Sequence, residues 1–588
     1  MVFSSPAWVP PIPSEIPDAV PVSSFSLRGK DDDVGQDDSR ALLVDGLSGK
    51  TFSRAVLRDR VEWLAQALAQ RLAWSPNEGS PWDKVVAIHS LNSVGLPQQT
   101  TCPSWASSLP IDYFVVCWAV HRLNGIVLPL HSTSTTAELT AHLESAKCST
   151  VFTCQPLLPA ALDAATQLSI PQSSIFTVSL PQGLVAGYSS PFLDTETLIT
   201  EGASLPPLNP LLWTDGQAKD QVAYLCATSG TSGKQKLAML THYGLIVNAV
   251  QLGAFEAPRR EPGKADVVTG VVPFSHGYGI GLTHIMVWRG DTMVVFPRFD
   301  MQLMLQSVQQ HRINRLYIVP PILVAMVSNP VLFDMFDLSS ITTIVSGSAP
   351  LDKSLADRVH SLQPQWRILG AYGLTESVLV ATFTSPGDCL AGSSGSLVPG
   401  FQARLVGPAG EEIEALDTPG EILLMSPTLF RGYLGNDAAT EGAFDAAGWL
   451  RTGDVGLFTR AEPSGHQHLF VLDRIKDMIK VKGSQVVPGD IETALRAHPA
   501  VDDVAVIGVP DETAGERPMA FVVRSKLGMA DADAEDLVDC LDEYVQDRMD
   551  ETHWLHDRIQ FVEALPKSAN GKVLRRVLRE RAGTGTAW

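Results

Sequence analysis

A short apolar run leads directly into a loop of hydroxyl residues, glycines and lysines in Val222-Ala-Tyr-Leu-Cys-Ala-Thr-Ser-Gly-Thr-Ser-Gly-Lys-Gln-Lys236. The apolar part has the length and composition of a buried strand. Glycines let the backbone turn its N–H groups toward an anion, and hydroxyls and lysines add donors and charge, so the loop suits a polyphosphate. It departs from the Walker pattern, because Thr228 stands where a glycine is required and Gln235 follows Lys234. Taken alone, it is also compatible with an ordinary flexible linker.

Apolar runs alternate with amphipathic stretches on both sides of this loop. Val85 to Ile88 predicts a buried strand, and Val56 to Leu72 predicts an amphipathic helix. This alternation is typical of a parallel sheet covered by helices, so the predicted fold class is α/β. Several short strands end at small polar residues, as Ile341 to Val345 does before Ser346-Gly-Ser-Ala-Pro350. Ligands of open α/β sheets bind at such carboxyl ends, so these residues are candidates for a binding site.

Composition divides the chain into three parts. Residues 1–40 are rich in proline, serine and aspartate and predict a flexible leader, because they carry too little apolar surface to order themselves. Residues 41–473 predict a large N-terminal domain of α/β subdomains, with a glycine-punctuated, strand-rich stretch at about 395–473 that predicts a small β-barrel or β-subdomain. Residues 474–588 combine strand and helix patterns and predict a smaller α+β C-terminal domain.

Charge and hydropathy exclude several classes of protein. The formal net charge is −20, so no overall positive field is available to hold nucleic acid or anionic lipid. The apolar stretch from Tyr113 to Val120 is far shorter than the ~20 residues that cross a bilayer, so no membrane span is expected. The seven cysteines lack zinc-site spacings and fit reduced thiols. The N-terminus has no signal-peptide pattern, and a cytoplasmic protein is expected.

Six further motifs follow the loop in a fixed order. They are Pro273-Phe-Ser-His-Gly-Tyr-Gly279, Ser346-Gly-Ser-Ala-Pro350, Ala371-Tyr-Gly-Leu-Thr-Glu376, Gly448-Trp-Leu-Arg-Thr-Gly-Asp454, Asp473-Arg-Ile-Lys-Asp-Met-Ile-Lys480 with Lys482-Gly-Ser-Gln485, and Pro566-Lys-Ser-Ala-Asn-Gly-Lys572. With the loop, they resemble the adenylate-forming superfamily of acyl-CoA synthetases, 4-coumarate–CoA ligases, luciferases and peptide-synthetase adenylation domains. The resemblance spans residues 228–572 and implies that the C-terminal domain is mobile.

The resemblance implies a reaction between two anions and a set of residues that would permit it. A carboxylate attacks the α-phosphorus of ATP and expels pyrophosphate, so a metal ion and cations must cancel the repulsion. Thr375 is implied to contact the α-phosphate and Glu376 to hold Mg²⁺, a hard cation that prefers carboxylate oxygen. Outside its motif, Glu376 could equally be a carboxylate at a helix start. The resemblance assigns the β- and γ-phosphates to Thr228, Ser229, Gly230, Thr231, Ser232, Gly233 and Lys236.

The nucleoside is implied to bind between two wall segments. Tyr372 offers a flat face to adenine, although a tyrosine taken alone is more often a core residue. Asp454 would accept from both ribose hydroxyls, and the alternative is that it only forms an Asx turn. The other wall residues that the resemblance implies are Ala371 and Gly373 on one side and Gly347, Ser348 and Ala349 on the other.

A hinge and a gate are also implied. Arg474 would reach the nucleotide, and Lys476 would be the hinge about which the C-terminal domain turns between half-reactions. Gly483 would leave room for the pantetheine arm of CoA. His276 would separate the acyl pocket from the thiol channel, although a lone histidine is more often a structural residue.

The implied catalytic residues of the C-terminal domain are mostly cationic. Lys572 is a compact charge on a long stem, and the resemblance implies that it bridges the substrate carboxylate and the α-phosphate. Lys480 and Gln485 would enter the same site during adenylation. Taken alone, the segment around Lys572 is compatible with a solvated basic loop.

These residues predict an AMP-forming acid–thiol ligase of secondary metabolism that uses ATP, Mg²⁺ and CoA. Adenylation domains for amino acids place an aspartate near the histidine motif, but Val271 to Gly281 contains no aspartate or glutamate. The expected substrate is therefore an unaminated carboxylic acid of the aryl, medium-chain or polyketide-like kind. Alternatives are an acyl-AMP ligase that loads the phosphopantetheine arm of a carrier protein, a luciferase-like oxygenase, and a nucleotide-sensing protein without turnover.

Overall fold

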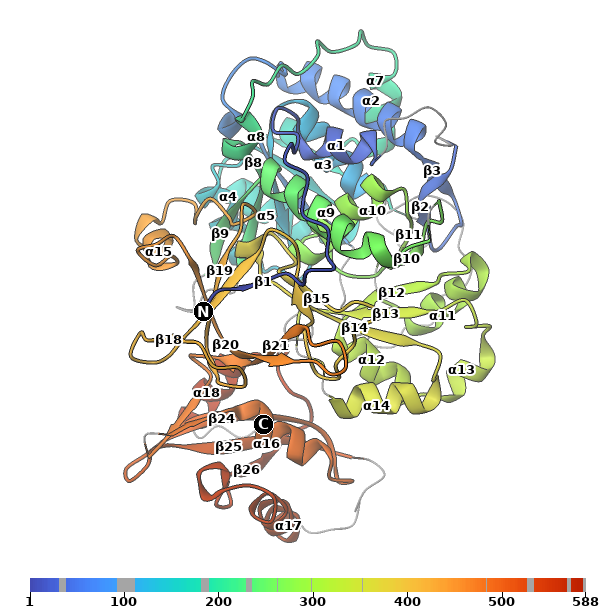
Figure 1. The fold of residues 1–588 in the computed structure, drawn as a ribbon. Helices are drawn as coiled ribbons and strands as arrows, with labels where there is room; N and C mark the ends of the chain where they lie inside the picture. Colours follow the sequence, from blue (N-terminus) through green and yellow to red (C-terminus); the bar gives the residue numbers. More distant parts are fainter. Residues whose placement is uncertain are drawn as a thin grey trace.

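The computed structural model describes the whole chain except residues 31–38, 92–111, 181–189, 229–234, 526–533, 568–572 and 585–588 and the single positions 262, 298, 350, 352 and 483. It has four sheets, of which two carry the helices that surround the main core, and the predicted α/β class is confirmed (Figure 1). No helix in these described residues is both long and apolar enough to cross a membrane.

The larger of the two helix-covered sheets has nine strands in the order β16-β15-β14-β13-β12-β10-β11-β2-β3. Its inner strands from β14 to β2 run parallel, and β3, β15 and β16 are antiparallel at the edges. All the inner parallel strands therefore present their carboxyl ends at one edge. The bounds are β2 Ala41–Asp45, β3 Thr51–Ser53, β10 Val267–Gly270, β11 Thr292–Val295, β12 Arg315–Ile318, β13 Thr343–Ser346, β14 Arg367–Tyr372, β15 Thr382–Phe383 and β16 Ser396–Leu397.

The second sheet has six strands in the order β7-β6-β4-β5-β8-β9. The strands from β7 to β8 run parallel, and β9 is antiparallel to β8, with which it forms a hairpin at the edge. That hairpin flanks the phosphate-like loop of the sequence. The bounds are β4 Val85–His89, β5 Ile126–Leu130, β6 Thr150–Thr153, β7 Ile175–Thr177, β8 Val222–Thr228 and β9 Lys236–Thr241.

Helices around these two sheets enclose the main core. Helix α3 is buried along nearly its whole length, because its sequence is apolar on every side. It packs beside α2 and α1, and α1 in turn contacts α10 and α9 (Figure 1). The helix bounds in this part are α1 Val22–Arg28, α2 Arg54–Leu72, α3 Asp112–Arg122, α4 Thr136–Ser145, α5 Leu158–Gln167, α7 Thr195–Gly202, α8 Gln217–Asp220, α9 His242–Glu256, α10 Gly277–Arg289, α11 Met301–His311, α12 Pro320–Val327, α13 Val331–Met335 and α14 Lys353–Leu362.

The third sheet contains the strands expected after residue 395 and one strand that was not expected. Its order is β1-β17-β19-β20-β21, with β18 paired to β17. Strand β1 comes from the N-terminus and pairs antiparallel with β17. The bounds are β1 Phe3–Ser4, β17 Gln402–Val406, β18 Glu412–Ile413, β19 Gly420–Met425, β20 Leu450–Arg460 and β21 Gln467–Arg474, with helix α15 at Asp437–Gly442.

The last sheet is built entirely from residues after 478. Its order is β23-β22-β25-β24, with β26 paired to β25, and α16 and α17 contribute to its core (Figure 1). Leu537, Leu541 and Val545 are buried on one face of α17, as their helical spacing predicts. The bounds are β22 Ile479–Val481, β23 Ser484–Val486, β24 Val501–Asp511, β25 Gly515–Arg524, β26 Ile559–Phe561, α16 Pro488–Arg496, α17 Ala534–Gln546 and α18 Arg575–Thr584.

The prediction of a flexible leader is wrong for residues 1–30. Phe3 is 1% exposed and its ring stacks on Phe458 at 4.0 Å between centroids. Val22 is also fully buried at the start of α1. The leader has few apolar residues, but these fill positions in cores that the rest of the chain has already formed. Residues 31–38, which include most of the aspartates, lie outside the described residues.

Two buried histidines, His242 and His284, contact α1, and a third, His121, lies with its Nε2 3.1 Å from the Ala223 carbonyl of β8. The Val22 N–H donates to Nδ1 of His242 at 3.1 Å, and Ser26 Oγ lies 2.9 Å from Nδ1 of His284. Nε2 of His284 lies 2.9 Å from the Tyr224 hydroxyl of β8. Burial lowers the pKa of His121 to about 4. Burial and the neighbouring histidines lower the pKa values of His242 and His284 well below 6.5.

We expect acidification from pH 7.5 to 5.5 to lower the free energy of unfolding. The stability that these histidines contribute by staying neutral is fully present above pH 6.5, near their pKa in the unfolded chain. It is lost as the pH falls toward their lower pKa values in the folded protein. For His121, with a folded pKa of about 4, the loss by pH 5.5 is about 1 kcal/mol. Urea unfolding at the two pH values measures it.

Replacing His284 by glutamine, which can still donate and accept, should reduce this pH dependence. The exposed His360→Gln is the matched control and should retain the full dependence. An unchanged pH dependence in His284→Gln would contradict the assignment of acid sensitivity to His284.

Candidate active site

The predicted wall segments meet at the carboxyl ends of two neighbouring parallel strands. Gly347, Ser348 and Ala349 follow β13, and Ala371 and Tyr372 end β14. Strands β13 and β14 are paired through Ser346 and Gly370, which fixes the two segments side by side. A Cβ on Gly347 would lie 3.8 Å from the Ala371 carbonyl oxygen, so the walls are in direct contact at their base.

Asp454 connects one of these walls to the third sheet. The residue is 8% exposed, and its Oδ2 accepts a hydrogen bond of 2.9 Å from the Tyr372 hydroxyl. The other oxygen lies 3.3 Å from Nε of Arg474, its Cα partner across β20 and β21. Burial and the Asp454 carboxylate raise the pKa of Tyr372 well above 10, so its hydroxyl remains a donor. Three predicted residues are thus joined by direct contacts.

Glu376 lies in a second cluster whose other members are Tyr433 and Lys236. Oε1 of Glu376 accepts a 2.7 Å hydrogen bond from the Tyr433 hydroxyl, and the Lys236 ammonium lies 4.8 Å from the centre of the same ring. No partner for Oε2 of Glu376 is found within the described part of the chain. One carboxylate oxygen is therefore oriented and the other is available, an arrangement that fits a hard divalent cation.

Tyr433 was not identified by sequence reasoning. It follows Gly432 in an extended segment that pairs with β9, where the Met239 N–H donates to the Gly432 carbonyl at 2.9 Å. An isolated bridge also joins Tyr433 to Ala238. Ala238 and Tyr433 are almost 200 positions apart in the chain. A pairing over this distance leaves no local pattern in the sequence. The only signal was a Gly-Tyr pair after the apolar Leu429-Phe430.

Thr375 and Glu376 lie on one turn of 3₁₀ helix, Thr375–Ser377, that is followed by a strained backbone. Val378 has a φ of 65°, which a β-branched residue rarely adopts. Gly373 makes this turn possible, because a Cβ there would lie 1.6 Å from the Leu379 carbonyl oxygen. The close approach that requires Gly373 is therefore made by the chain itself, and the surrounding packing must hold Val378 in its strained conformation.

The phosphate-like loop is described only at its two ends. Thr228 and Lys236 are Cα partners at the loop end of the β8–β9 hairpin. The predicted phosphate-binding residues Ser229, Gly230, Thr231, Ser232 and Gly233 lie outside the described residues. Because Lys236 contacts Tyr433, the end of the loop is fixed next to Glu376.

His276 has a structural contact that does not depend on a ligand. It is the N-cap of α10, and its Nδ1 accepts from the Tyr278 N–H at 3.3 Å. The next residue, Gly277, is close to the α-phosphate candidate, since a Cβ there would lie 3.9 Å from the Thr375 hydroxyl oxygen. The structure therefore places the start of α10 beside Thr375 and gives His276 a capping role.

The C-terminal candidates are separate from these clusters in the described arrangement. Lys480 and Gln485 are Cα partners on the exposed β22–β23 hairpin. Among the contacts of the described residues, no hydrogen bond or ion pair joins either side chain to Tyr372, Asp454 or Glu376. Gly483 and Lys572 lie outside the described residues.

Comparison with known proteins identifies the family. Residues 106–434 match the profile described as AMP-binding enzyme, and residues 490–572 match the AMP-binding enzyme C-terminal domain. The chain belongs to the AMP-binding enzyme family. The predicted membership of the adenylate-forming superfamily is thereby confirmed.

Individual relatives of this AMP-binding enzyme cover nearly its whole length. The acyl-CoA ligase easD of Emericella nidulans is 52% identical over 581 residues, which cover 98% of this chain and 100% of the relative. The acyl-CoA ligase cm3C of Cordyceps militaris is 52% identical over 588 residues, covering 99% and 91%. The crystal structure of ATP-bound MatB from Rhodopseudomonas palustris superposes with a TM-score of 0.77 at 25% identity, covering 95% and 99%.

We expect Tyr372→Phe to weaken AMP binding about fivefold while the fold stays intact. The substitution keeps the ring but removes the donor to the buried Asp454 carboxylate, and a typical hydrogen bond contributes about 1 kcal/mol. Isothermal titration with AMP measures the change. Tyr317→Phe is the matched control, because within the described residues the Tyr317 hydroxyl has no partner. Equal affinities in both variants would show that the Tyr372 hydroxyl does not organise the nucleotide site.

Proposed function

We propose that this AMP-forming acyl-CoA ligase activates an aryl, medium-chain or polyketide-like carboxylic acid as its adenylate and then transfers the acyl group to CoA. The observation that carries the proposal is the position of two clusters at one sheet edge. Asp454, Tyr372 and Arg474 form one cluster, and Glu376 and Tyr433 belong to the other. Residues 371–376 join them, so a nucleoside at the first cluster would place its phosphates toward the second. The 52% identity to named acyl-CoA ligases supports the same reaction.

In the first half-reaction, a carboxylate oxygen of the acid attacks the α-phosphorus of ATP. The bond from that phosphorus to the pyrophosphate oxygen breaks, and the electron pair leaves with pyrophosphate. Asp454 is preorganised to accept from the ribose hydroxyls, because the Tyr372 hydroxyl and Arg474 hold both of its oxygens in place. Each carboxylate oxygen has a second lone pair for the ribose. Fixed groups of this kind lower the barrier because they need no reorganisation during reaction.

Glu376 and Lys236 would serve the phosphate side. Glu376 would hold Mg²⁺ through its available oxygen, and the bound ion would neutralise phosphate charge as pyrophosphate leaves. Tyr433 orients Glu376 through its hydroxyl. Burial and Glu376 raise the pKa of Tyr433 well above 10, so this hydroxyl stays protonated and continues to donate. Lys236 adds a positive charge beside the same ring.

The acid would bind beside α10. The start of this helix lies next to Thr375, and the preceding Phe274 is buried against Phe114, with ring centroids 4.7 Å apart. Because the stretch from Val271 to Gly281 contains no carboxylate, nothing there would pair with an α-amino group. An unaminated acid with an apolar body therefore fits this wall best. In this arrangement His276 would stand between the acid and the incoming thiol.

In the second half-reaction, the sulfur of CoA attacks the acyl carbon and the bond to AMP breaks. Lys572 and the thiol cannot both occupy the space beside one carbonyl, so we propose that residues 474–588 turn about Lys476 between the two steps. Lys480, Gln485 and Lys572 would face the site only during adenylation, and Gly483 would line the pantetheine path afterwards.

A screen of carboxylic acids by pyrophosphate release, followed by thioester detection, tests the function directly. Free CoA and a phosphopantetheinylated carrier protein are compared as acceptors of the acyl group. Pyrophosphate release with transfer to CoA is the expected result. Transfer to the carrier alone would assign the chain to carrier loading, and AMP binding without pyrophosphate release for any acid would contradict the ligase.

We expect Glu376→Ala to cut pyrophosphate release about a hundredfold or more, the order expected for the loss of one transition-state electrostatic group.

Tyr433→Phe should leave the metal site intact but less ordered, so the Mg²⁺ concentration for half-maximal rate should rise severalfold. Equilibrium titration of the ATP-bound enzyme with Mn²⁺, followed by its paramagnetic signal, measures metal affinity without turnover. Normal metal affinity in both variants would remove this cluster from the metal site.

We expect Lys572→Ala to abolish acyl-adenylate formation while thioester formation from supplied acyl-AMP and CoA continues. Gly483→Leu should do the reverse, because its side chain would occupy the proposed pantetheine path. Single-turnover assays of each half-reaction separate the two effects. Arg576→Ala is a matched control, since its charge is paired with Glu580 on the exposed face of α18. Equal loss of both half-reactions in Lys572→Ala would contradict the domain alternation.

A further inference from the structure

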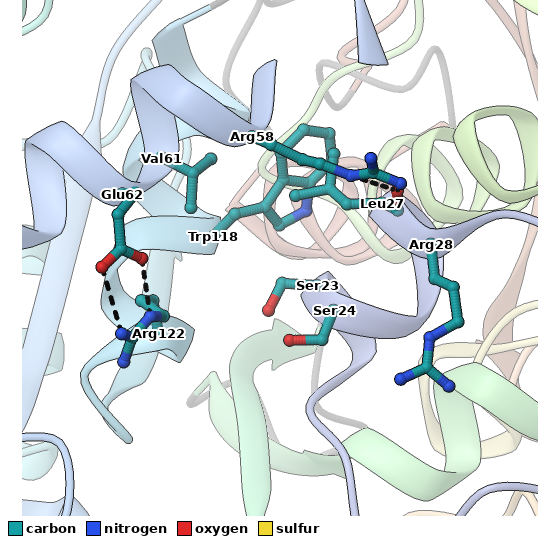
Figure 2. A pocket seen from close by; sticks show the side chains of 9 residues that line it. All are labelled: Ser23, Ser24, Leu27, Arg28, Arg58, Val61, Glu62, Trp118 and Arg122. Atoms are coloured by element: carbon teal, nitrogen blue, oxygen red, sulfur yellow. Dashed lines mark hydrogen bonds and ion pairs between the residues drawn. The ribbon is translucent and has the colours of Figure 1, made fainter. Parts of the chain in front are cut away.

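Two cavities lie away from the residues assigned to the candidate active site. One, of about 460 Å³, lies between α1, α2 and α3 (Figure 2). Arg122 donates there to Glu62 at 2.7 and 3.1 Å. Arg58 donates to the Leu27 carbonyl, so these charged side chains already have partners within the chain (Figure 2). The second cavity, of about 310 Å³, differs in its charges and in its position.

The second cavity lies at the amino ends of parallel strands of the nine-stranded sheet. Its lining includes Arg315 of β12, Thr343 of β13 and Arg367 of β14, which are successive Cα partners and form one row across the sheet. Residues of one row have their side chains on the same face of a sheet. The predicted wall segments follow or end β13 and β14, so the cavity and the candidate active site lie at opposite ends of the same strands.

Much of the charge beside this cavity is neutralised in a largely buried network of ion pairs. The network consists of three arginines and three carboxylates, which are Arg260, Arg289, Arg315, Glu256, Asp266 and Asp291. Its positive and negative charges are equal in number, so its carboxylates do not balance a further arginine. A separate pair joins Lys264 to Glu261 at 3.0 Å on the exposed side of the cavity.

Two arginines of the lining, Arg259 and Arg367, stand outside these pairs. Among the interactions of the described residues, no hydrogen bond or ion pair involves either guanidinium. The guanidinium carbon of Arg259 lies 5.8 Å from the centre of the Trp8 ring, and a Cβ on Gly387 would lie 2.9 Å from the same carbon. Arg259 is therefore held by neutral groups that leave its charge uncompensated. Both arginines are exposed, so an anion from solvent can reach them.

Two uncompensated guanidiniums and a neighbouring hydroxyl suit a phosphate group. A guanidinium is a planar fork of N–H donors that binds phosphate oxygens two at a time. A phosphate monoester carries about two negative charges at neutral pH and three strong acceptor oxygens, whereas a monocarboxylate has one charge and two oxygens. The cavity is at the lower end of the range for small organic ligands, about 300–1,000 Å³, and leaves room for a small organic part.

We propose that this cavity binds a dianionic phosphate group, either as the free ion or in a small phosphate monoester. The guanidiniums of Arg259 and Arg367 donate to its oxygens and balance its two charges. The hydroxyl of Thr343, the row neighbour of Arg367, is a further donor. This site is separate from the phosphate-like loop, which follows β8 of the second sheet. It therefore does not serve the phosphates of ATP in the proposed reaction.

The test is isothermal titration of the full chain with inorganic phosphate and with glycerol 3-phosphate. Saturable binding and a rise in the thermal midpoint are expected, because a ligand that binds only the folded chain stabilises it. Tighter binding of glycerol 3-phosphate would assign the site to a monoester, and tighter binding of inorganic phosphate would assign it to the free ion. Acetate, with one charge, should bind at least tenfold more weakly. Equal affinity for acetate would overturn the dianion assignment, and no saturable binding of either phosphate would overturn the site.

Substitutions separate this cavity from the phosphate-like loop, whose own affinity for phosphate is common to every variant. Arg259→Gln and Arg367→Gln each remove one charged donor and should weaken binding at the cavity about tenfold. Arg312→Gln is the matched control and should leave binding unchanged, because Arg312 is an exposed arginine that is already paired with Asp337 at 2.6 Å. Phosphate binding that is unaltered in both Arg259→Gln and Arg367→Gln would overturn the assignment, whatever the outcome for adenylation.

Discussion

The geometry of the candidate active site depends on one buried carboxylate. A buried carboxylate is stable only where its charge is compensated, and Asp454, which is 8% exposed as a residue, is held by the Tyr372 hydroxyl and by Arg474. Tyr372 ends a strand of the nine-stranded sheet, whereas Asp454 and Arg474 face each other in the third sheet. Directly after Arg474, the Ile475 N–H donates to the Gly453 carbonyl at 2.9 Å. One carboxylate therefore joins the predicted nucleoside wall to the third sheet, and the backbone bond between Ile475 and Gly453 continues from that sheet to the start of the C-terminal part.

Local patterns predicted the elements that form this scaffold. Val85 to Ile88 lies in β4, and Val56 to Leu72 lies in α2, because the spacing of apolar residues directly reflects which side of an element is buried. The prediction that the segment beginning at Ser346 lies at a binding edge followed from a general rule, since ligands of open α/β sheets bind at the carboxyl ends of strands. The chemical roles came from the resemblance alone. Composition and periodicity contain no information on which carboxylate meets a ribose or a metal.

The features that sequence reasoning missed depend on contacts between distant segments. Tyr433 reaches Glu376 because its segment pairs with β9, and no short-range pattern in the sequence predicts such a pairing. The stretch after residue 395 was expected to form its own β-subdomain, but its sheet is completed by β1 from the other end of the chain. In both cases, the partner in the pairing lies more than 150 residues away, as the paired residue numbers show.

The N-terminal segment shows why composition is a poor guide to order when a preformed surface is available. Composition measures how much apolar area a segment can bury by itself, and residues 1–30 have little. Their position is set instead by a few specific contacts: Phe3 on Phe458, the Val22 N–H on His242, and Ser26 on His284. Because Ser26 donates its proton to the Val22 carbonyl, it accepts from His284, whose other nitrogen then accepts from Tyr224. This neutral chain of hydrogen bonds ends on β8, the strand that leads into the phosphate-like loop. The segment that composition assigned to disorder therefore supports the strand on which the loop begins.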